Sequence, residues 1–515
     1  MALQEKFHQI ITDPTLSPKQ KSNFLALEAD ASVPYLTVSE AVKEAMEHGI
    51  ICDMFEGNAP FKPRYVLPDY GKFLKQGSEY LELEPAQDLD EAINALTILY
   101  HHVPSVTNIP VYLGQLDEIM LPFAEGLDED TIYRKLKLFW IMLDRTLPDA
   151  FMHANIGPSD NIICRSILHI DAELKQVAPN LTFMYDPAIT PDDLLRLAAK
   201  NICETSKPHI ANYPLHANAF DNKGFGIVSC YNSLPLAGGA NTLVRMNLKQ
   251  AALKAENRVD FLNHVLPHYS DLMYELIEAR SAFLHQDSHF FNSFLVEEGL
   301  IDESRFAPMF GIYGMAEAVD ILLEKEGIQA NYGHDDGANQ LGYQISAALD
   351  SIVKSTPVTY GYNGRALLHA QGGISLDKDV TPGVRIPYGT EPDPVSHIQA
   401  LAEHHQYYTS GISDILTIDE TVKGNPEAMY QLCKGALALG MREFTANVDS
   451  NDLIRVTGYM IKLSDIEKFN QEGSRTNTTW LGNEAAANTG ILNRKPRVIS
   501  HEQTPYYGNN SGNGQ

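Results

Sequence analysis

Positive charge is scarce in this chain of 515 residues. Lysine and arginine together number 39 against 66 aspartates and glutamates, which gives a formal net charge of -27 at pH 7. A nucleic-acid-binding protein needs clustered lysine and arginine side chains to neutralise phosphates. We therefore expect no nucleic-acid partner. The acidic balance favours solubility and indicates nothing about the fold.

Long hydrophobic runs are also missing. The apolar run LFWIML (138–143) is far shorter than the roughly 20 residues that a membrane-spanning helix needs. The first residues, MALQEKFHQIITD, contain Glu5 and Lys6 and lack the apolar h-region of a secretory signal. These two observations predict a cytoplasmic protein that makes no contact with a membrane.

Cysteines are few, and none lies in a Cys-x-x-Cys pair. This spacing indicates neither a thiolate zinc site nor a disulfide framework. We expect free thiols in a reducing compartment and no bound metal. The five cysteines are Cys52, Cys164, Cys203, Cys230 and Cys433.

The pattern of apolar residues changes along the chain, and we find no internal repeat. Residues 1–150 contain mainly amphipathic helical patterns, such as those at 37–49 and 128–145. After this region, strand-like runs alternate with helical ones, which predicts an α/β core, with a closed barrel as one form. The last residues, 501–515, are rich in glycine and asparagine and predict a flexible tail.

A glycine interrupts the strand-like stretch DLIRVTGYMIKL (452–463). Gly458 in that position gives up packing and costs conformational entropy. It marks either a bulge or turn, or a backbone position that is used chemically. A radical on a glycine Cα is stabilised by the flanking amide nitrogen and carbonyl, and no Cβ prevents the backbone from becoming planar there. The residues alone leave both alternatives open.

Cys230 ends the short apolar run GFGIVSC (224–230) and precedes the loop YNSLPLAGGAN (231–241). Most free cysteines are buried structural thiols. A nucleophilic cysteine would need a nearby histidine base, and the loop contains none. A third role is hydrogen-atom transfer between a backbone radical and a substrate.

The residues Arg455, Val456, Thr457, Gly458 and Tyr459 resemble the Arg-Val-x-Gly-Tyr motif of glycyl radical enzymes. NLTFMYDP (180–187) and KPHIANY (207–213) are similar to their recurring strand–helix–strand unit. FGIYGMAEAV (310–319) resembles a segment of the anaerobic ribonucleotide reductases. The resemblance covers roughly residues 150–480, and the chain as a whole looks most like the YjjI-type glycyl radical group.

This resemblance implies a fold and a division of the chain. The fold is a ten-stranded α/β barrel of two antiparallel half-barrels, with helices around it and the cysteine and glycyl loops inside. The division is a mainly helical N-terminal region packed on the barrel (1–150), a barrel core with the Cys230 loop (151–420), a glycyl radical segment with Gly458 (421–500) and the flexible tail (501–515).

The resemblance also implies roles. Gly458 stores a radical, and the thiyl radical of Cys230 abstracts hydrogen from a small-molecule substrate, in an oxygen-sensitive enzyme of anaerobic metabolism. Arg455, Val456 and Tyr459 complete the motif. The activating partner is a radical S-adenosylmethionine enzyme, to which the S-adenosylmethionine and the iron–sulfur cluster belong. A homodimer is compatible with a large barrel. The alternative is a non-catalytic barrel relative that binds a metabolite or a partner.

Three departures limit the expected chemistry. Pyruvate formate-lyases use two adjacent cysteines, whereas Cys230 lies between Ser229 and Tyr231. Diol and choline-type eliminases carry a glutamate two residues after the cysteine, where this chain has Asn232. Anaerobic ribonucleotide reductases carry a cysteine zinc site, which this chain lacks. The sequence therefore predicts the class of enzyme without naming a reaction or a substrate.

Several polar residues are candidates for a substrate pocket. Asn212 ends a strand near the expected barrel mouth, and His153 flanks a turn. Arg365 in GYNGR (361–365) is placed to meet an anionic group. Asn232 follows the cysteine loop. Residues 473–498 are expected to pack against the barrel or to contact the activating enzyme.

Overall fold

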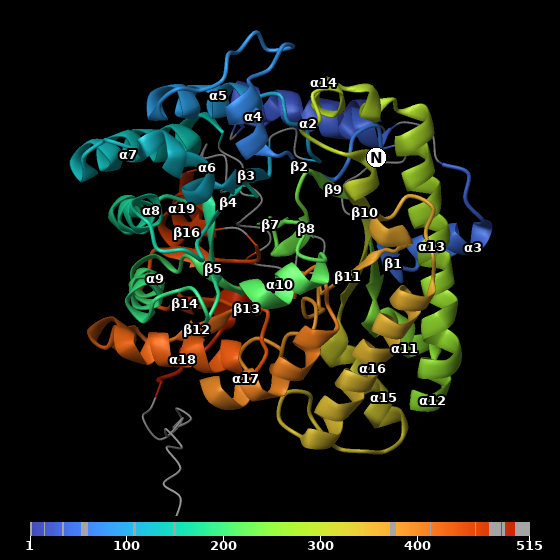
Figure 1. Cartoon of the computed structure of the whole chain (residues 1–515). Coiled ribbons are helices and arrows are strands. Elements are labelled where there is room, and N and C mark those ends of the chain that lie inside the picture. Colours follow the sequence, from blue (N-terminus) through green and yellow to red (C-terminus); the bar gives the residue numbers. More distant parts are fainter. Residues whose placement is uncertain are drawn as a thin grey trace, which may run out of the picture.

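The computed structural model describes residues 3–14, 16–32, 36–52, 60–106, 110–147, 151–370, 377–412, 414–458, 460–472, 486 and 490–499. Two five-stranded sheets lie at its centre, and most helices lie outside them (Figure 1). Within these ranges, no hydrogen-bonded strand pair joins one sheet to the other. The class is α/β, as strand–helix alternation predicts.

The first sheet has the strand order β13-β6-β5-β4-β3. β3 to β6 are parallel, and β13 pairs antiparallel with β6. The strands are β3 (Tyr112–Gln115), β4 (His153–Ile156), β5 (Asn180–Tyr185), β6 (His209–Asn212) and β13 (Glu443–Phe444). Helices α8 (Ile162–Leu174) and α9 (Asp192–Thr205) connect consecutive strands, and α7 (Glu129–Thr146) and α18 (Pro426–Ala438) pack beside them. This arrangement is the repeated βαβ unit, in which helices cover one face of a parallel sheet.

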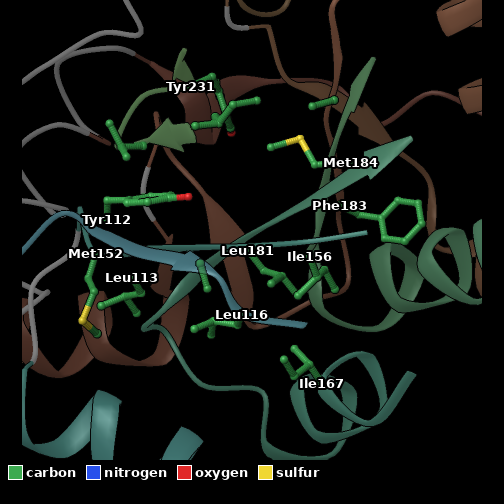
Figure 2. Close-up of a cluster of buried hydrophobic side chains, with 14 of the residues drawn as sticks. Tyr112, Leu113, Leu116, Met152, Ile156, Ile167, Leu181, Phe183, Met184 and Tyr231 are labelled. Atoms are coloured by element: carbon green, nitrogen blue, oxygen red, sulfur yellow. The ribbon is translucent and has the colours of Figure 1, made fainter. Parts of the chain in front are cut away.

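Successive side chains of β5 point to opposite faces of this sheet. Figure 2 shows Leu181 and Ile156 on the side of Ile167 in α8, whereas Met184 and Tyr231 lie on the other side. Leu181, Ile156 and Ile167 are fully buried or nearly so in one apolar core. The outer face therefore packs on helices, and the inner face is free to hold polar side chains such as Thr182.

The second sheet has the order β1-β9-β10-β11, with β2 also paired to β9. β9, β10 and β11 are parallel, and β1 and β2 run antiparallel to β9. The strands are β1 (Ile51–Cys52), β2 (Tyr65–Leu67), β9 (Gly238–Asn247), β10 (Phe306–Tyr313) and β11 (Leu367–Ala370). Val244 and Phe310 belong to a second core. It includes side chains of α11 (Leu248–Lys254), α13 (Leu266–Ala282), α15 (Met315–Lys325) and α16 (Asp336–Ser355).

The first 150 residues are mainly helical but also supply strands to both sheets. β1 and β2 join the second sheet, and β3 forms an edge of the first. The helices of this region are α1 (Leu3–Thr12), α2 (Pro18–Ala31), α3 (Glu40–Glu47), α4 (Tyr70–Gln76), α5 (Leu89–Tyr100), α6 (Leu116–Met120) and α7 (Glu129–Thr146). The helices expected at 37–49 and 128–145 are thus confirmed as α3 and α7.

The remaining helices pack on both sheets, α18 and α10 beside the first sheet and α11, α13, α15 and α16 beside the second. They are α10 (Tyr213–Ala219), α11 (Leu248–Lys254), α12 (Arg258–Asp260), α13 (Leu266–Ala282), α14 (Phe294–Glu297), α15 (Met315–Lys325), α16 (Asp336–Ser355), α17 (Pro394–Ala402), α18 (Pro426–Ala438) and α19 (Leu463–Glu472). In the described part of the chain, no helix combines the length and the apolar composition that a bilayer span requires.

A hairpin lies between the two sheets. β7 (Phe225–Val228) and β8 (Asn232–Pro235) pair antiparallel and contact β3, β4 and β9 (Figure 1). Asn155 of β4 holds the hairpin in register, because its Nδ2 donates to the carbonyl oxygen of Ile227 and its Oδ1 accepts from the Ile227 N–H, both at 2.9 Å. The connection between β7 and β8, residues 229–231, is called the Cys230 loop below.

A second hairpin near the C-terminus packs in small apolar clusters apart from the two large cores. β15 (Leu453–Arg455) and β16 (Met460–Lys462) pair antiparallel. This β15–β16 hairpin follows β12 (Leu416–Ile418) and β14 (Ala446–Val448), which pair parallel with each other. Its apolar cluster is distinct from the two large cores and consists of Ile415, Ile454, Val456, Ile461, Ile466, Ala486 and Ile491.

Candidate active site

The Cys230 loop presents one thiol at the tip of the inner hairpin. Ser229 and Tyr231, on either side of Cys230, have φ angles of +52° and +64°. A side-chain-bearing residue in this left-handed region costs about 1–2 kcal/mol. Cys230 is 2% exposed. The fold thus maintains a strained turn that fixes a buried cysteine between the two sheets.

Gly458 lies directly against the backbone of this loop. A Cβ built on Gly458 would lie 2.1 Å from the Cys230 Cα and 2.3 Å from the Ser229 carbonyl oxygen. Real Cβ atoms do not approach backbone atoms this closely. The φ angle of Gly458 is outside the left-handed region. The position therefore requires glycine because two backbones meet there, and not because of an unusual conformation.

The stretch 452–463 is two strands with a connection, and not one interrupted strand. β15 ends at Arg455 and β16 begins at Met460, so Gly458 lies in the turn between them. The turn also brings Thr457 to the thiol: the Thr457 Oγ1 and the Ser229 Oγ each lie 3.8 Å from the Cys230 Sγ. The Tyr231 hydroxyl donates to the Thr457 carbonyl oxygen at 3.3 Å. The two turns are thus held together on both sides of Cys230.

Arg455 joins the β15–β16 hairpin to the first sheet. Its fully buried guanidinium donates to the Asn180 Oδ1 at 2.9 Å and to the Ser206 carbonyl oxygen at 3.2 Å. The Asn180 Nδ2 in turn donates to the carbonyl oxygen of Gly458. The Arg455 Cζ also lies 5.5 Å from the centre of the Tyr231 ring, in a cation–π contact. Arg455 is thus placed to position both turns.

Of the two other motif residues, Val456 and Tyr459, the structure describes only Val456. Val456 is fully buried in the apolar cluster of the β15–β16 hairpin. Tyr459 lies outside the described residues. A hydrophobic anchor beside Gly458 fits a turn that must be placed to within a fraction of an ångström.

Two neutral histidines line the inner face of the first sheet behind the loop. The His153 Nε2 lies 2.5 Å from the Thr182 Oγ1, which lies 2.8 Å from the His209 Nδ1. The His209 ring packs on the Tyr231 ring at a centroid distance of 4.3 Å. Burial, together with the nearby Arg455 charge, lowers the pKa of His153 to about 3. Burial also lowers the pKa of His209 well below its usual value. Both imidazoles are therefore neutral near pH 7.

A buried carboxyl group, Glu443, stands on the same inner face. Glu443 pairs across the sheet with Ala211, so it shares a face with His209, two residues earlier on β6. Burial raises the pKa of Glu443 well above the usual range, which favours its protonated form. The His216 Nε2 lies 3.8 Å from its Oε1. A Cβ on Gly411 would lie 3.1 Å from this Oε1 and 1.9 Å from the Tyr231 carbonyl oxygen, so Glu443 stands close to the Cys230 loop.

The predicted pocket residues occupy different places. Asn232 is buried in the inner hairpin, where its Nδ2 donates to the Val228 carbonyl oxygen at 3.0 Å, and His153 stands behind the loop as described. Asn212 is half-buried at the end of β6 and donates to the carbonyl oxygens of Leu437 and Met441, both at 3.2 Å. Arg365 is exposed at the surface. The structure brings only Asn232 and His153 to the Cys230 loop.

The sequence analysis did not identify several residues around the two turns, among them Asn180, His209, Gly411 and Glu443. Asn180 begins the strand-like run NLTFMYDP, but nothing in the run connects it with residue 458, which is far away in the chain. Gly411 and Glu443 carry no local signal, because only the pairing of β13 with β6 and the path of residues 408–412 place them there. Across the described ranges, no group of three or more His, Cys, Asp or Glu side chains is arranged to hold a metal ion.

Comparison with known proteins shows the family of this chain. The sequence profile of the family described as "Glycyl radical enzyme YjjI-like" matches residues 16–497. The chain is also 64% identical over 503 residues to the uncharacterized protein YjjI of Escherichia coli (strain K12), covering 98% of each chain. The chain therefore belongs to the YjjI-like family of glycyl radical enzymes.

Solved structures show the same fold at low sequence identity. Hydroxyproline dehydratase from Clostridioides difficile, solved with trans-4-hydroxy-L-proline bound, matches with a TM-score of 0.73 and 14% identity, over 97% of this chain and 89% of that one. The anaerobic ribonucleotide reductase from Thermotoga maritima matches with a TM-score of 0.65 and 14% identity, over 92% and 89%. The predicted α/β barrel fold of glycyl radical enzymes is confirmed.

Proposed function

We propose that Gly458 stores the radical of this enzyme and that Cys230 uses it. The observation that carries the proposal is the direct contact between the Gly458 backbone and the Cys230 backbone inside the molecule. In the first step, the Cys230 thiol gives a hydrogen atom, a proton with one electron, to the Gly458 Cα. The S–H bond breaks, a C–H bond forms, and the unpaired electron moves to sulfur.

The second step passes the radical to the substrate. The Cys230 sulfur takes a hydrogen atom from a substrate C–H bond, so the S–H bond is restored and the unpaired electron lies on carbon. The reverse transfers at the end of the cycle return the radical to Gly458. Burial of Cys230 and Thr457 supports this role, because exclusion of water and oxygen protects reactive intermediates.

Activation requires a partner. A radical S-adenosylmethionine enzyme, which carries its own iron–sulfur cluster, removes one hydrogen atom from the Gly458 Cα. Gly458 is buried, so the β15–β16 hairpin must leave the barrel for this step. The apolar side chains of this hairpin lie in two small clusters outside the two large cores, one with Ile415 and Ile491 and one with Val177. This packing supports such a movement, since the hairpin can detach without disrupting the two large cores. We place the reaction in the cytoplasm under anaerobic conditions.

The polar groups behind the Cys230 loop favour a small hydroxyl-bearing substrate. His153 and His209 are neutral, and Glu443 is held in its protonated form. These groups offer hydrogen-bond donors and acceptors, which suits hydroxyl groups, and the buried charges of Arg455 and Arg385 act on Tyr231 in the same loop. The absence of a second cysteine beside Cys230 argues against acyl transfer as in the pyruvate formate-lyases.

The experiment is electron paramagnetic resonance after anaerobic incubation with the activating enzyme, reductant and S-adenosylmethionine. We expect a doublet from the single remaining α-hydrogen, and cleavage of the chain at Gly458 on exposure to air. Gly458→Ala should give no signal, because alanine both clashes with Cys230 and hinders a planar Cα. Gly435→Ala is the control, since no atom lies within 4 Å of a Cβ at that helical position.

Two results would contradict the proposal. One is an undiminished radical in Gly458→Ala. The other is wild-type protein that gives no signal and stays intact in air, although the same activator preparation acts on another glycyl radical protein. The second result would favour the non-catalytic alternative, in which the barrel binds a metabolite or partner.

A further inference from the structure

The chain returns to the barrel after the β15–β16 hairpin. Residues 490–499, called the latch below, contact both. Ile491 belongs to the apolar cluster of the hairpin, together with Ile461 and Ile466. At the other end, the Arg497 N–H donates to the Thr417 carbonyl oxygen at 3.2 Å, and the Asp419 N–H donates to the Arg497 carbonyl oxygen at 3.0 Å. The latch thus lies beside β12, joined to it by one parallel bridge between Ile418 and Arg497, and it also packs on the hairpin.

Arg494 anchors the latch in a buried site formed by Glu391, Asp414 and Tyr388, called the Arg494 socket below. Its side chain is 1% exposed, and its Nε lies 2.6 Å from the Glu391 Oε1 while its Nη2 donates to the Asp414 Oδ1 at 3.1 Å. The Arg494 Cζ also lies 4.4 Å from the centre of the Tyr388 ring. Although burial opposes the charge, His397 and Arg494 hold the pKa of Asp414 well below its usual range. A charged and buried carboxylate needs such a partner, so loss of Arg494 weakens the socket.

A second arginine strengthens the same attachment. The Arg497 Nη1 donates to the Pro392 carbonyl oxygen at 2.6 Å and lies 2.9 Å from the His397 Nδ1. The His397 Nε2 lies 2.6 Å from the Asp414 Oδ2. His397 therefore bridges the two attachment points, and the latch docks through a connected polar network rather than through a single ion pair.

The socket also reaches the Cys230 loop. The Tyr388 hydroxyl, beneath Arg494, accepts a hydrogen bond from the fully buried Arg385. The charge of Arg385 acts on Tyr231, the residue after Cys230. Contacts thus lead from Arg494 through Tyr388 to Arg385, whose charge acts on the loop. When the latch is docked, it holds the hairpin and also packs on the tyrosine that bonds to Arg385.

We propose that the latch keeps the β15–β16 hairpin inside the barrel and that it undocks before the activating enzyme reaches Gly458. This inference rests on the proposed function, because activation is the step that needs the hairpin to leave. β14 precedes the hairpin in the chain and the latch follows it. When the latch is docked, the hairpin is therefore held at both of its ends, by β14 at one and by the latch at the other. Weakening the Arg494 socket should increase the fraction of open molecules.

The test is hydrogen–deuterium exchange of the full-length, unactivated protein, followed by mass spectrometry. In Arg494→Gln, we expect peptides covering 453–472 and 490–499 to exchange about tenfold faster, while peptides covering 153–212 are unchanged. Arg196→Gln is the matched control, because Arg196 also pairs with a carboxylate, Glu427, and lies over a tyrosine ring, Tyr430, but on the protein surface. It should leave exchange at 453–472 unchanged.

A milder variant and a second measurement keep the inference testable if Arg494→Gln folds poorly. Arg497→Gln removes the side-chain contacts to Pro392 and His397 but keeps the backbone bridge. It should accelerate exchange at 453–472 by a smaller factor. With the activating enzyme, both variants should acquire the Gly458 radical faster than wild-type protein, as followed by electron paramagnetic resonance.

The outcomes separate the latch from the radical chemistry. Fast exchange at 490–499 with wild-type exchange at 453–472 would overturn the latch, whatever the radical yield. Coupled fast exchange in both regions without a radical in any protein would support the latch as the hold on the hairpin and would contradict the proposed function. Coupled exchange with an unchanged rate of radical formation would overturn undocking as a step that limits activation.

Discussion

Asn180 on β5 donates a hydrogen bond from its side-chain amide to the carbonyl oxygen of Gly458. The same side chain accepts a hydrogen bond of 2.9 Å from Arg455, so one buried asparagine holds two residues of the glycyl motif. The first sheet thus fixes the turn that faces Cys230. Asn180 and Gly458 are far apart in the sequence, and this contact exists only in the folded chain.

Asn180→Leu should loosen the Gly458 turn. The substitution leaves a buried carbonyl and a buried guanidinium each short of one partner, at a cost of about 1–3 kcal/mol in the free energy of unfolding. We expect lower urea resistance and a shorter lifetime of the Gly458 radical. Asn201→Leu is the control, because Asn201 is also buried but its side chain bonds to Asp171 rather than to Gly458 or Arg455. Equal radical lifetimes in the two variants would contradict the role of Asn180.

Cys230→Ser should separate radical storage from radical transfer without knowledge of the substrate. In D2O the Cys230 thiol carries deuterium, and the proposed transfer steps exchange it for the α-hydrogen of Gly458. The wild-type doublet should therefore collapse to a singlet, whereas the doublet of Cys230→Ser persists. Cys433→Ser, which changes a buried cysteine in α18, should behave as wild type. A collapse in Cys230→Ser would show that another group exchanges the hydrogen.

Buried histidines should make the protein sensitive to mild acid. Burial lowers the pKa of His153, His216, His404 and His405 to about 3. The unfolded chain binds protons near pH 6.5 and the folded chain does not, so the free energy of unfolding falls as the pH falls below 6.5. We expect a loss of about 1 kcal/mol for each such histidine between pH 7 and pH 5.5. Urea denaturation at these two pH values measures it, and equal midpoints would contradict the burial argument.

The ionisation of Glu443 should change the free energy of unfolding with pH in the direction opposite to that of the buried histidines. Its pKa is raised by burial, so its folded form keeps a proton that the unfolded chain releases above about pH 4.3. Glu443 therefore costs stability as the pH rises through this range toward its folded pKa. Glu443→Gln keeps the shape and removes the ionisation, so it should be nearly as stable as wild type at pH 4.5 and more stable than wild type at pH 8, as measured by urea denaturation. A stability difference that does not grow between pH 4.5 and pH 8 would contradict the raised pKa of Glu443.

Part of the fold was predictable because its signals are local. The helices at 37–49 and 128–145 follow from the spacing of apolar residues, and the βαβ units follow from alternating strand-like and helical runs. The stretch 452–463 shows the limit of such signals. Its β-forming residues indicate strand throughout, but the turn at Gly458 forms because the chain reverses against the Cys230 loop.

The sequence alone determined the chemistry that is available: one glycine in an Arg-Val-x-Gly-Tyr motif and one cysteine at the start of a loop. These signals are short and local, so they can be read without a fold. Only the tertiary structure decided that Gly458 touches Cys230, that Glu443 and His209 share a face behind the loop, and that Arg494 returns to Asp414. Each of these contacts joins residues from distant parts of the chain, and strand pairing and burial, rather than neighbouring residues, fix their geometry.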